Sequence, residues 1–525
     1  MLWRTSVLLA TTTCAGAAAD SFAGSKSCLP CHKAIYDNYV RTPMGRSITA
    51  PDATLLSSPG GATGGKVTAG TFQVVAVGGE LFQLDSRYET RHKLEYAIGS
   101  GENGISFIVR RGSHLFQAPV SYYSSSKTWE LSPGFEQTGA GFDRPIYQEC
   151  IVCHAGRARA VPHRDGLYET PPFDEAAIGC ENCHGPGASH IRQRSAASIV
   201  NPRRLPARLA EDLCLQCHQG GDARVLLPGK HYGDFRPGKP LIEIMAVVAL
   251  TEAKDADLLE HHDSMKLSRC YRASNGKLGC LTCHNPHRRP DLASFRKACL
   301  TCHNDCKLDR AARQASADNC AGCHMPKRPV GVISHSALTN HRIPVRPGSG
   351  ATNAPSFPAS IGMPGLRVVN GSESTRLPLV TQLSAYGELL TRAPGLNERY
   401  GALLKEASQQ APQDAVVQAA LAHQAFLEKR ADAADLLKKA IDSGAPGLVL
   451  HLDLAQTLED PVAALEKAEQ LFPFSREVRK RLVLGYIRQK AYAKAQGSME
   501  RYVEDFPEDE FMGDLLRKIP KGPRP

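Results

Sequence analysis

Apolar and polar residues follow different periods in two parts of the chain. Within residues 66–131 they alternate in short runs at 72–77, 80–84 and 105–109, which is the period of strands with one buried face. Within residues 376–525 the apolar positions recur at helical spacing among Ala, Leu, Glu and Lys. We therefore predict a β-rich insert in the first of these regions and an all-α region in the second.

Prolines divide the helical region at intervals of 34, 27 and 34 residues, and the stretches at 416–441 and 477–506 have the pattern of helix pairs. This region resembles tetratricopeptide (TPR) repeats, whose period is about 34 residues, although only Gly485 and Tyr486 meet the consensus and the middle unit is short. The resemblance implies a stack of helix pairs with a groove for a protein partner. The alternative is a capping domain without a free ligand. The dividing prolines are Pro412, Pro446, Pro473 and Pro507.

The cysteines carry the most specific chemical signal. Fourteen of the 17 cysteines form seven Cys-x-x-Cys pairs, and a His follows every pair. Cys-x-x-Cys-His is the attachment sequence of c-type haem. The thiols bond covalently to the porphyrin edge and the His ligates the iron, so the three residues must be close together. The motifs, numbered 1 to 7 in chain order, are Cys28, Cys31 and His32; Cys150, Cys153 and His154; Cys180, Cys183 and His184; Cys214, Cys217 and His218; Cys280, Cys283 and His284; Cys299, Cys302 and His303; Cys320, Cys323 and His324.

Two other uses of cysteine pairs explain this pattern less well. Structural zinc sites use paired Cys-x-x-Cys knuckles, and redox dithiols or disulfide frameworks use the cysteines alone. Neither requires a His after each pair, and seven is an odd number for four-cysteine zinc sites. The sequence therefore predicts seven covalently bound c-type haems with their iron.

Six of the motifs lie within residues 150–324. Aromatic residues are only 6% of the chain, while Gly and Pro number 45 and 35, so we expect short helices and long loops around cofactors that supply buried apolar surface. Residues 346–372 are rich in Pro, Gly, Ser and Asn, which indicates a linker or a strapped extended arm. The predicted fold is an α+β, partly irregular, haem-packed domain at 20–345, a linker at 346–375 and the all-α TPR-like repeat domain at 376–525.

The start of the chain has the features of an export signal. Arg4 precedes a short apolar run, and small residues precede Asp20 as they do at a cleavage site, so we predict a signal peptide at 1–19. Cys14 raises the alternative of a lipid anchor, but the residues before it do not form a lipobox. Covalent haem attachment follows export in bacteria, so we expect the periplasm or the cell surface.

The formal net charge of +10 does not by itself indicate nucleic-acid binding. Lys and Arg are scattered without interleaved aromatic residues, and haem propionates would pair with many of them. The longest later apolar run, at 241–250, contains Glu243 and is too short to cross a bilayer. We expect redox partner proteins, no nucleic acid and no transmembrane span.

A six-coordinate haem iron needs a second ligand besides the motif His. Twelve further histidines are present, and we interpret His423 and His451 as ordinary residues of the repeats. His190 and His287 are badly angled for the iron of the motif they follow, so neighbouring haems are their expected partners. The leading second ligands, against ordinary hydrogen-bonded roles, are His163, His190, His287, His335 and His341.

Around these residues the chain resembles the multihaem cytochromes related to the tetrahaem cytochrome c of nitrifiers, including those fused to tetratricopeptide repeats. The resemblance spans roughly residues 25–346, through CLPCHKAIYDNYVRTPMGRS, GCENCHGPGASH, SRCYRASNGKLGCLTCHNPH and CAGCHMPKRP followed by HSALTNHRIP. Many relatives have His at the place of Met44, so this chain departs from the family pattern at one ligand. Met can also ligate haem iron and raises its potential, so Met44 is a candidate ligand of a higher-potential haem, against a core methionine or an open site. The remaining ligand would come from His231, His261 or His262, with His92 and His114 as weaker options.

Cys270 and Cys306 lie outside the motifs, each flanking motifs 5 and 6. In an oxidising compartment such leftover cysteines commonly pair. We therefore predict a disulfide between them.

Three functions compete. The first is an electron-transfer protein that passes electrons along a chain of seven haems and needs no substrate pocket. The second is a multihaem oxidoreductase for a small nitrogen or sulfur compound, which needs one open iron. The third is an assembly scaffold in which the repeats are primary. All seven motifs end in His and candidate second ligands outnumber the irons, so electron transfer is the preferred hypothesis and catalysis the alternative.

Overall fold

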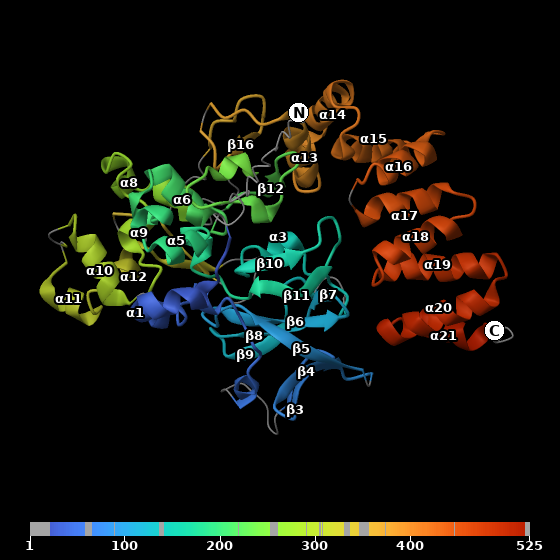
Figure 1. Cartoon of the computed structure of the whole chain (residues 1–525), viewed down its shortest axis with the longest axis horizontal. Helices are drawn as coiled ribbons and strands as arrows, with labels where there is room; N and C mark the ends of the chain where they lie inside the picture. The colour runs from blue at the N-terminus through green and yellow to red at the C-terminus, as the bar shows by residue number, and fades with distance from the viewer. Residues whose placement is uncertain are drawn as a thin grey trace, which may run out of the picture.

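The computed structural model describes residues 21–57, 66–88, 90–135, 141–218, 220–252, 261–289, 291–303, 306, 308–329, 337–345, 356–372, 374–445 and 447–519. The predicted signal peptide, Cys14 and His335 lie outside these residues. Within them, the N-terminal part combines antiparallel sheets with short helices and the C-terminal part is helical, as the sequence predicts (Figure 1).

The β-rich insert forms one antiparallel sheet in the order β2-β3-β4-β5-β6-β8-β9, with β1 on β5 and β7 on β6. Side chains alternate along β4, where Leu81 and Gln83 are buried between more exposed neighbours. The buried Gln83 amide bonds both backbone groups of Val120, at 2.8 and 3.0 Å, and so links β4 to β8. The strands are β1 (Ile48–Thr49), β2 (Lys66–Ala69), β3 (Phe72–Val77), β4 (Glu80–Asp85), β5 (Arg91–Ile98), β6 (Gly104–Arg111), β7 (His114–Gln117), β8 (Val120–Tyr123) and β9 (Thr128–Leu131).

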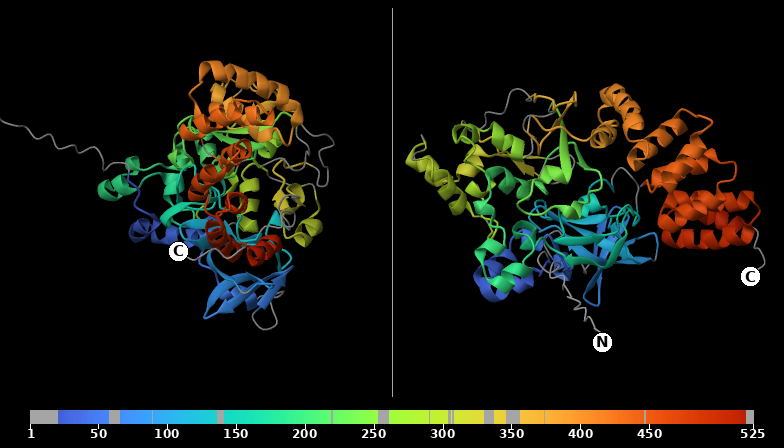
Figure 2. Two further views of the ribbon diagram at one scale, coloured as in Figure 1. Left: turned by 90° about the vertical axis from the view of Figure 1, so that its right-hand side faces the viewer. Right: turned by 45° about the horizontal axis from the view of Figure 1, so that its top comes forward.

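The motifs lie on short helices, as expected. Helices α8 to α12 contain no buried residue among those described, which leaves their apolar surface for something other than a side-chain core. These five helices form the end of the molecule opposite the repeats (Figures 1 and 2). The helices of this part are α1 (Leu29–Tyr39), α3 (Gln148–Ile151), α4 (Glu181–His184), α5 (Ala188–Gln193), α6 (Ala207–Leu215), α7 (His261–Leu267), α8 (Arg269–Ala273), α9 (Cys280–Cys283), α10 (Leu292–Leu300), α11 (Arg310–Ala315) and α12 (Cys320–His324).

Two hairpins and several 3-10 turns complete this part. Strands β10 and β11 pair, as do β14 and β15. The hairpin strands are β10 (Arg157–Ala160), β11 (Tyr168–Glu175), β14 (Lys327–Pro329) and β15 (Ala337–Thr339). The 3-10 turns are η1 (Ser25–Cys28), η2 (Met44–Arg46), η3 (Ala53–Ser57), η4 (Ala196–Ser198), η5 (Pro202–Arg204), η6 (Tyr232–Asp234), η7 (Leu241–Glu243) and, between the first two helices of the repeats, η8 (Pro394–Leu396).

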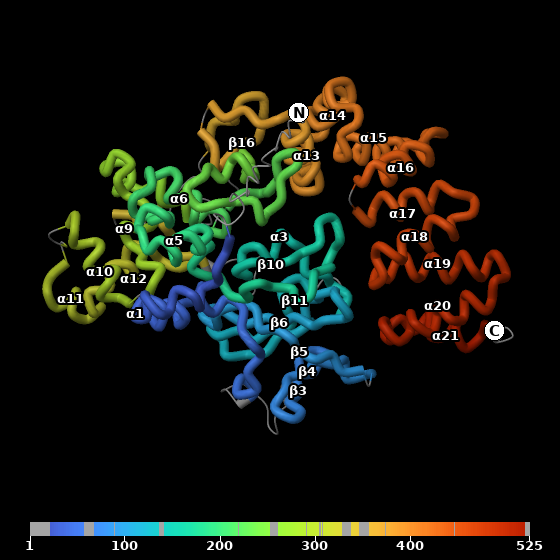
Figure 3. The backbone as a smooth tube through the Cα atoms, viewed as in Figure 1, coloured from blue at the N-terminus to red at the C-terminus, as the bar shows by residue number. Residues whose placement is uncertain are grey.

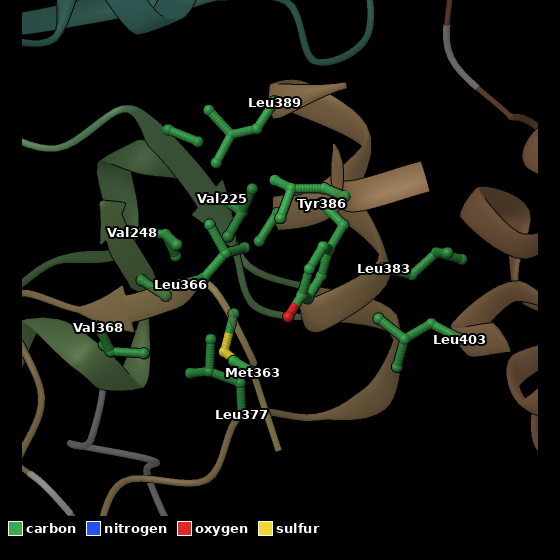
Figure 4. Close-up of a cluster of buried hydrophobic side chains, with 14 of the residues drawn as sticks. Val225, Val248, Met363, Leu366, Val368, Leu377, Leu383, Tyr386, Leu389 and Leu403 are labelled. Carbon is green, nitrogen blue, oxygen red and sulfur yellow. The ribbon is translucent and has the colours of Figure 1, made fainter. Parts of the chain in front are cut away.

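A three-stranded sheet joins the N-terminal part to the repeats. It consists of β12 (Ala223–Leu226), β13 (Met245–Leu250) and β16 (Leu366–Val368), the last of which lies in the Pro- and Gly-rich segment and pairs Val368 with Val248. This segment is thus an arm strapped to the sheet over its described part, 356–372. Figure 4 shows the shared core, in which Val225, Val248 and Leu366 pack with Leu383 and Tyr386 of the first repeat helix.

The repeats stack as successive helix pairs along one side of the molecule (Figure 3). The predicted helix pairs are confirmed, and the short middle unit is explained by two helices of only 10 residues each. The helices are α13 (Leu379–Leu389), α14 (Asn397–Gln410), α15 (Ala415–Leu427), α16 (Ala433–Asp442), α17 (Leu448–Thr457), α18 (Val462–Leu471), α19 (Arg476–Arg488), α20 (Tyr492–Asp505) and α21 (Glu510–Lys518).

The last repeats contact the large sheet again. Phe474, in the turn between α18 and α19, packs edge-on against His114 and Phe116, with ring centroids 5.1 and 5.3 Å apart. The Arg111 guanidinium of β6 lies 5.5 Å from the rings of both Phe116 and Phe474 and 3.4 Å from Asp505 Oδ1. We name these five residues the clasp.

Two further contacts support the clasp. Arg164 donates to the carbonyls of Gln470 and Leu471 at 3.2 Å each, which places a cation at the negative end of α18. Arg476 of α19 pairs with Asp143 at 3.1 Å. The repeat stack is therefore anchored at both of its ends.

Candidate haem-attachment sites

Each motif occupies a helical turn or adjoins one. Motif 7 lies within α12 and motif 3 within α4 and its N-cap. Residues three and four apart share one helix face, so this local structure places both thiols and the imidazole of a motif on the same side. The local geometry is that required to hold one porphyrin by its edge and its iron.

Three motif histidines face a predicted second ligand from another part of the chain. His32 faces His190 with ring centroids 6.3 Å apart and planes 19° apart, and His184 faces His287 at 5.9 Å and 10°. His284 faces His341 at 6.3 Å and 27°. A metal ion holds an imidazole nitrogen at about 2.0–2.1 Å, so one ion shared by two facing rings sets their centroids about 6 Å apart. The three pairs fit a six-coordinate iron.

Hydrogen bonds at Nδ1 orient several of these rings. Nδ1 lies 2.8 Å from the Val200 carbonyl in His184, 2.9 Å from that of Ser195 in His190, and 2.8 Å from that of Thr339 in His341. Because a carbonyl oxygen only accepts, Nδ1 carries the proton and donates, which leaves the Nε2 lone pair free for a metal. His324 makes the same bond to Pro344 at 2.8 Å.

The structure separates the two neighbouring histidines His261 and His262. His262 Nε2 lies 3.2 Å from the Glu211 carboxylate, so this nitrogen is already engaged in a buried hydrogen bond. His261 Nε2 is buried without a hydrogen-bond partner among the described residues, and its ring centroid lies 4.3 Å from that of His341. Burial lowers the pKa of His261 to about 4, which keeps the ring neutral and able to ligate. His261 is the better candidate of the two.

His163 and His231 face one another rather than a motif histidine. Their centroids lie 6.3 Å apart with planes 61° apart, and both residues are exposed. Met44 lies half-buried in η2, and the ring opposite His32 is that of His190, so Met44 would ligate only another haem. All three residues remain predicted ligands.

The two weaker candidates belong to the packing of the sheet. His92 stacks on Phe142 at 3.9 Å, and burial lowers its pKa to about 3. His114 is part of the clasp.

The two histidines of the repeats lie away from the motifs in the sequence. His423 hydrogen-bonds Asp453 at 2.6 Å, and His451 is buried in the repeats.

Neighbouring motifs contact each other directly. Cys153 of motif 2 donates to the Gln216 carbonyl of motif 4 at 3.7 Å, and Cys217 of motif 4 donates to the Val152 carbonyl of motif 2 at 4.0 Å. The Gln216 side chain reaches the Asn182 carbonyl of motif 3 at 3.4 Å. Motifs 2, 3 and 4 therefore form one contiguous group.

Glu181, between the two cysteines of motif 3, joins motifs 1 and 3. Its buried carboxylate accepts from the backbone N–H groups of Ala23 and Gly24 at 2.8 Å each and of Gly187 at 2.7 Å. Sequence reasoning missed this residue because it occupies a variable position of the motif. An acidic side chain placed between the two cysteines of a Cys-x-x-Cys-His motif was the available signal.

Thiols of different motifs also interact. A hydrogen bond from Cys28 lowers the pKa of Cys180 to about 7, and one from Cys217 lowers the pKa of Cys153 to about 7. These interactions place Cys28 beside Cys180 and Cys217 beside Cys153, so motif 1 adjoins motif 3 and motif 2 adjoins motif 4.

The predicted disulfide between Cys270 and Cys306 is wrong for this structure, in which both thiols are free. Cys270 lies instead close enough to Cys283 and Cys299 that its charge raises the pKa of each, after the larger effect of their burial. Flanking positions in the sequence therefore did not translate into a contact between these two thiols.

No helix in the described part of the chain is long and apolar enough to cross a bilayer. No family model matches the sequence, and no curated protein matches it.

Solved structures show distant resemblances. The outer cell wall cytochrome OcwA aligns over 88% of this chain and 99% of its own, with 16% identity and a TM-score of 0.41. An undecahaem cytochrome from the S-layer of Carboxydothermus ferrireducens aligns over 88% of this chain and 70% of its own, with 13% identity and a TM-score of 0.30. The TPR protein YrrB aligns over 26% of this chain and 77% of its own, with 16% identity and a TM-score of 0.23. At TM-scores below 0.5 these resemblances carry no argument, and function is inferred from the residues of this chain.

Proposed function

We propose that this chain is an exported multihaem c-type cytochrome that holds seven covalently attached haems and transfers electrons between partner proteins. The observation that carries the proposal is the set of three facing imidazole pairs, each of which joins a motif histidine to a distant histidine. Such pairs belong to six-coordinate iron with both axial positions taken by the protein. That arrangement suits electron transfer rather than substrate binding.

Bound haem supplies reversible one-electron chemistry at its iron. The protein contributes the rest. The cysteines fix each porphyrin by its edge, and the Nδ1 hydrogen bonds of His184, His190 and His341 hold the ligating nitrogens in position. Contacts such as that between the Gln216 side chain of motif 4 and the Asn182 carbonyl of motif 3 keep neighbouring attachment sites together.

The proposed domains follow the predicted layout: a signal peptide at 1–19, a haem domain at 20–345, the strapped arm at 346–375 and repeats at 376–525. We place the mature protein in the periplasm or at the cell surface of a bacterium. The second ligands proposed are His163, His190, His231, His287, His335, His341 and Met44, with His261 added by its buried and unpartnered Nε2.

The repeats are proposed to dock a redox partner. Val416, Leu427 and Val449 expose 36%, 65% and 55% of their surface on the helices between the two anchored ends. Apolar side chains on a stack of this kind suit contact with another protein.

The experiment is to express the full chain with haem maturation and to record its intact mass, its pyridine haemochrome spectrum and its electron paramagnetic resonance. We expect seven haems, with low-spin signals at least for motifs 1, 3 and 5. Fewer than seven would contradict the attachment at one or more motifs. A single high-spin haem that binds cyanide or nitrite would favour the oxidoreductase alternative.

A further inference from the structure

A cavity of about 170 Å³ lies beside α7 and α8, between these helices and residues 340–345. Its wall includes Arg269, Asn340, Arg342 and Pro344, and no Asp or Glu is among the described residues that line it. Small-molecule pockets usually exceed about 300 Å³, so this cavity suits a carboxylate side arm better than an entire substrate.

Arg342 provides the sharpest observation. Its Nη1 atom is buried and has no hydrogen-bond partner within the part of the chain that the structure describes. A buried guanidinium N–H without an acceptor is costly, whereas one that meets a carboxylate makes a strong charge-assisted bond. The group that satisfies Arg342 is therefore expected to be an anion.

The backbone next to Arg342 is also held in an unusual conformation. Ile343 has a φ of 50°, in the left-handed region that is rarely adopted by a β-branched residue. Such conformations persist where the surroundings impose them, often at ligand sites. The wall of the cavity is thus a constrained segment.

Two motifs adjoin this wall. His341, directly before Arg342, faces His284 of motif 5 at 6.3 Å. The Pro344 carbonyl accepts the Nδ1 proton of His324 in motif 7 at 2.8 Å. Every porphyrin carries two propionates, so a carboxylate is available from either motif.

We propose that this cavity binds the propionate carboxylates of the porphyrin attached at motif 5 or motif 7, with Arg342 as the inner cation and Arg269 as the outer one. The proposal rests on the proposed haem binding and adds two residues that position a porphyrin and raise its potential. A positive charge beside a haem disfavours the ferric state, which carries more positive charge than the ferrous state.

The test uses the full haem-loaded chain and measures its midpoint potentials by spectroelectrochemistry. Arg342→Gln is expected to lower one of the seven potentials and Arg342→Lys to retain it. Arg269→Gln changes an exposed residue and is expected to lower the same potential by less than Arg342→Gln does. It replaces Arg342→Gln as the test if that variant fails to fold. Arg272→Gln, on the same helix but outside the cavity, is the matched control. Unchanged potentials in both cavity variants would overturn the proposal.

Two arms identify the source of the carboxylate. The shift is expected to disappear on a background that lacks Cys280 and Cys283 if motif 5 supplies it, and on one that lacks Cys320 and Cys323 if motif 7 does. A shift that survives on both backgrounds, or potentials that change with added inorganic phosphate, would overturn the assignment. Intact mass counts the haems independently of the potentials. A haem missing from the unsubstituted chain contradicts the proposed function, whereas seven haems with potentials unchanged in both cavity variants contradict only the cavity site.

Discussion

At the scale of the residue, the two imidazole rings of a facing pair come from segments far apart in the sequence. His190 follows motif 3 but faces His32 of motif 1, and its Nδ1 donates to the Ser195 carbonyl at 2.9 Å. This hydrogen bond leaves the Nε2 lone pair of His190 free for a metal. The ligand proposed for motif 1 thus comes from a segment about 160 residues further along the chain.

Replacing this ring should open one iron. His190→Ala is expected to convert one of the seven haems from low-spin to high-spin and to create about one carbon monoxide site per chain, because only one axial position loses its ligand. Visible and electron paramagnetic resonance spectra measure this change. His423→Ala, in the repeats, should leave both spectra unchanged, and a wholly low-spin His190→Ala protein would show that His190 is not a ligand.

Glu181 gives a second residue-scale prediction, on stability. Its carboxylate accepts three backbone N–H groups while buried, and hydrogen bonds to charged groups contribute roughly 1.5–3 kcal/mol each. We expect Glu181→Gln to lower the free energy of unfolding by about 2–4 kcal/mol, since an amide keeps only part of this arrangement. Denaturation of the haem-loaded protein in guanidinium chloride measures it.

The matched control is Glu169→Gln, which removes an exposed partner of Arg159. Surface ion pairs contribute roughly 0–1 kcal/mol, so this change should be nearly silent. Equal effects of the two substitutions would contradict the structural role of Glu181.

At the scale of the element, the repeats depend on close helix contacts as well as on periodicity. Gly485 of α19 lies against Val462 of α18, where an added Cβ would approach Val462 Cγ2 to 2.8 Å. No side chain fits between these helices without a shift. Gly485, which partly satisfies the TPR consensus, is thus required by the close packing of these two helices.

Gly485→Ala therefore reverses the usual effect of alanine in a helix. Alanine is favoured over glycine by about 1 kcal/mol in helices, but overpacking costs about 1–3 kcal/mol, so we expect a net loss of stability on thermal unfolding. Gly497→Ala in α20 is the control, because nothing lies within 4 Å of its added Cβ, and it should stabilise. Val462→Ala should rescue Gly485→Ala; if both glycine variants stabilise, the tight contact is refuted.

At the scale of the whole molecule, the repeat stack is fixed at two places. The first end shares a core with the sheet of β12, β13 and β16, as Figure 4 shows. The other end reaches the large sheet through the clasp. The helices between these anchors are therefore held relative to the N-terminal part of the chain.

Breaking the clasp should release one end of the repeat stack. Phe474→Ala removes a half-buried ring, which costs less than the roughly 3–5 kcal/mol of a full core position, and we expect about 1–3 kcal/mol. Faster hydrogen exchange and proteolysis in α18–α21, with unchanged haem spectra, are the expected results. Phe511→Ala is the control, since that ring is 58% exposed. Equal protection from hydrogen exchange and proteolysis in the two variants would mean that the clasp does not hold the repeat stack.

The predictable features were those that depend on neighbours along the chain. Cys-x-x-Cys-His spacing identified all seven motifs, alternation identified strands such as β3 and β6, and helical periodicity identified the pair of α19 and α20. Each of these signals is local, because a helical turn or a strand places near residues at defined angles.

The sequence by itself thus determined the haem motifs, the kinds of elements and their order. Only the tertiary structure decided that His190 faces His32, that Glu181 joins motif 1 to motif 3, that Cys270 and Cys306 stay apart and that Phe474 meets Phe116. These contacts join segments remote in sequence. Their distances depend on how every element between them packs, and no periodicity along the chain encodes that packing.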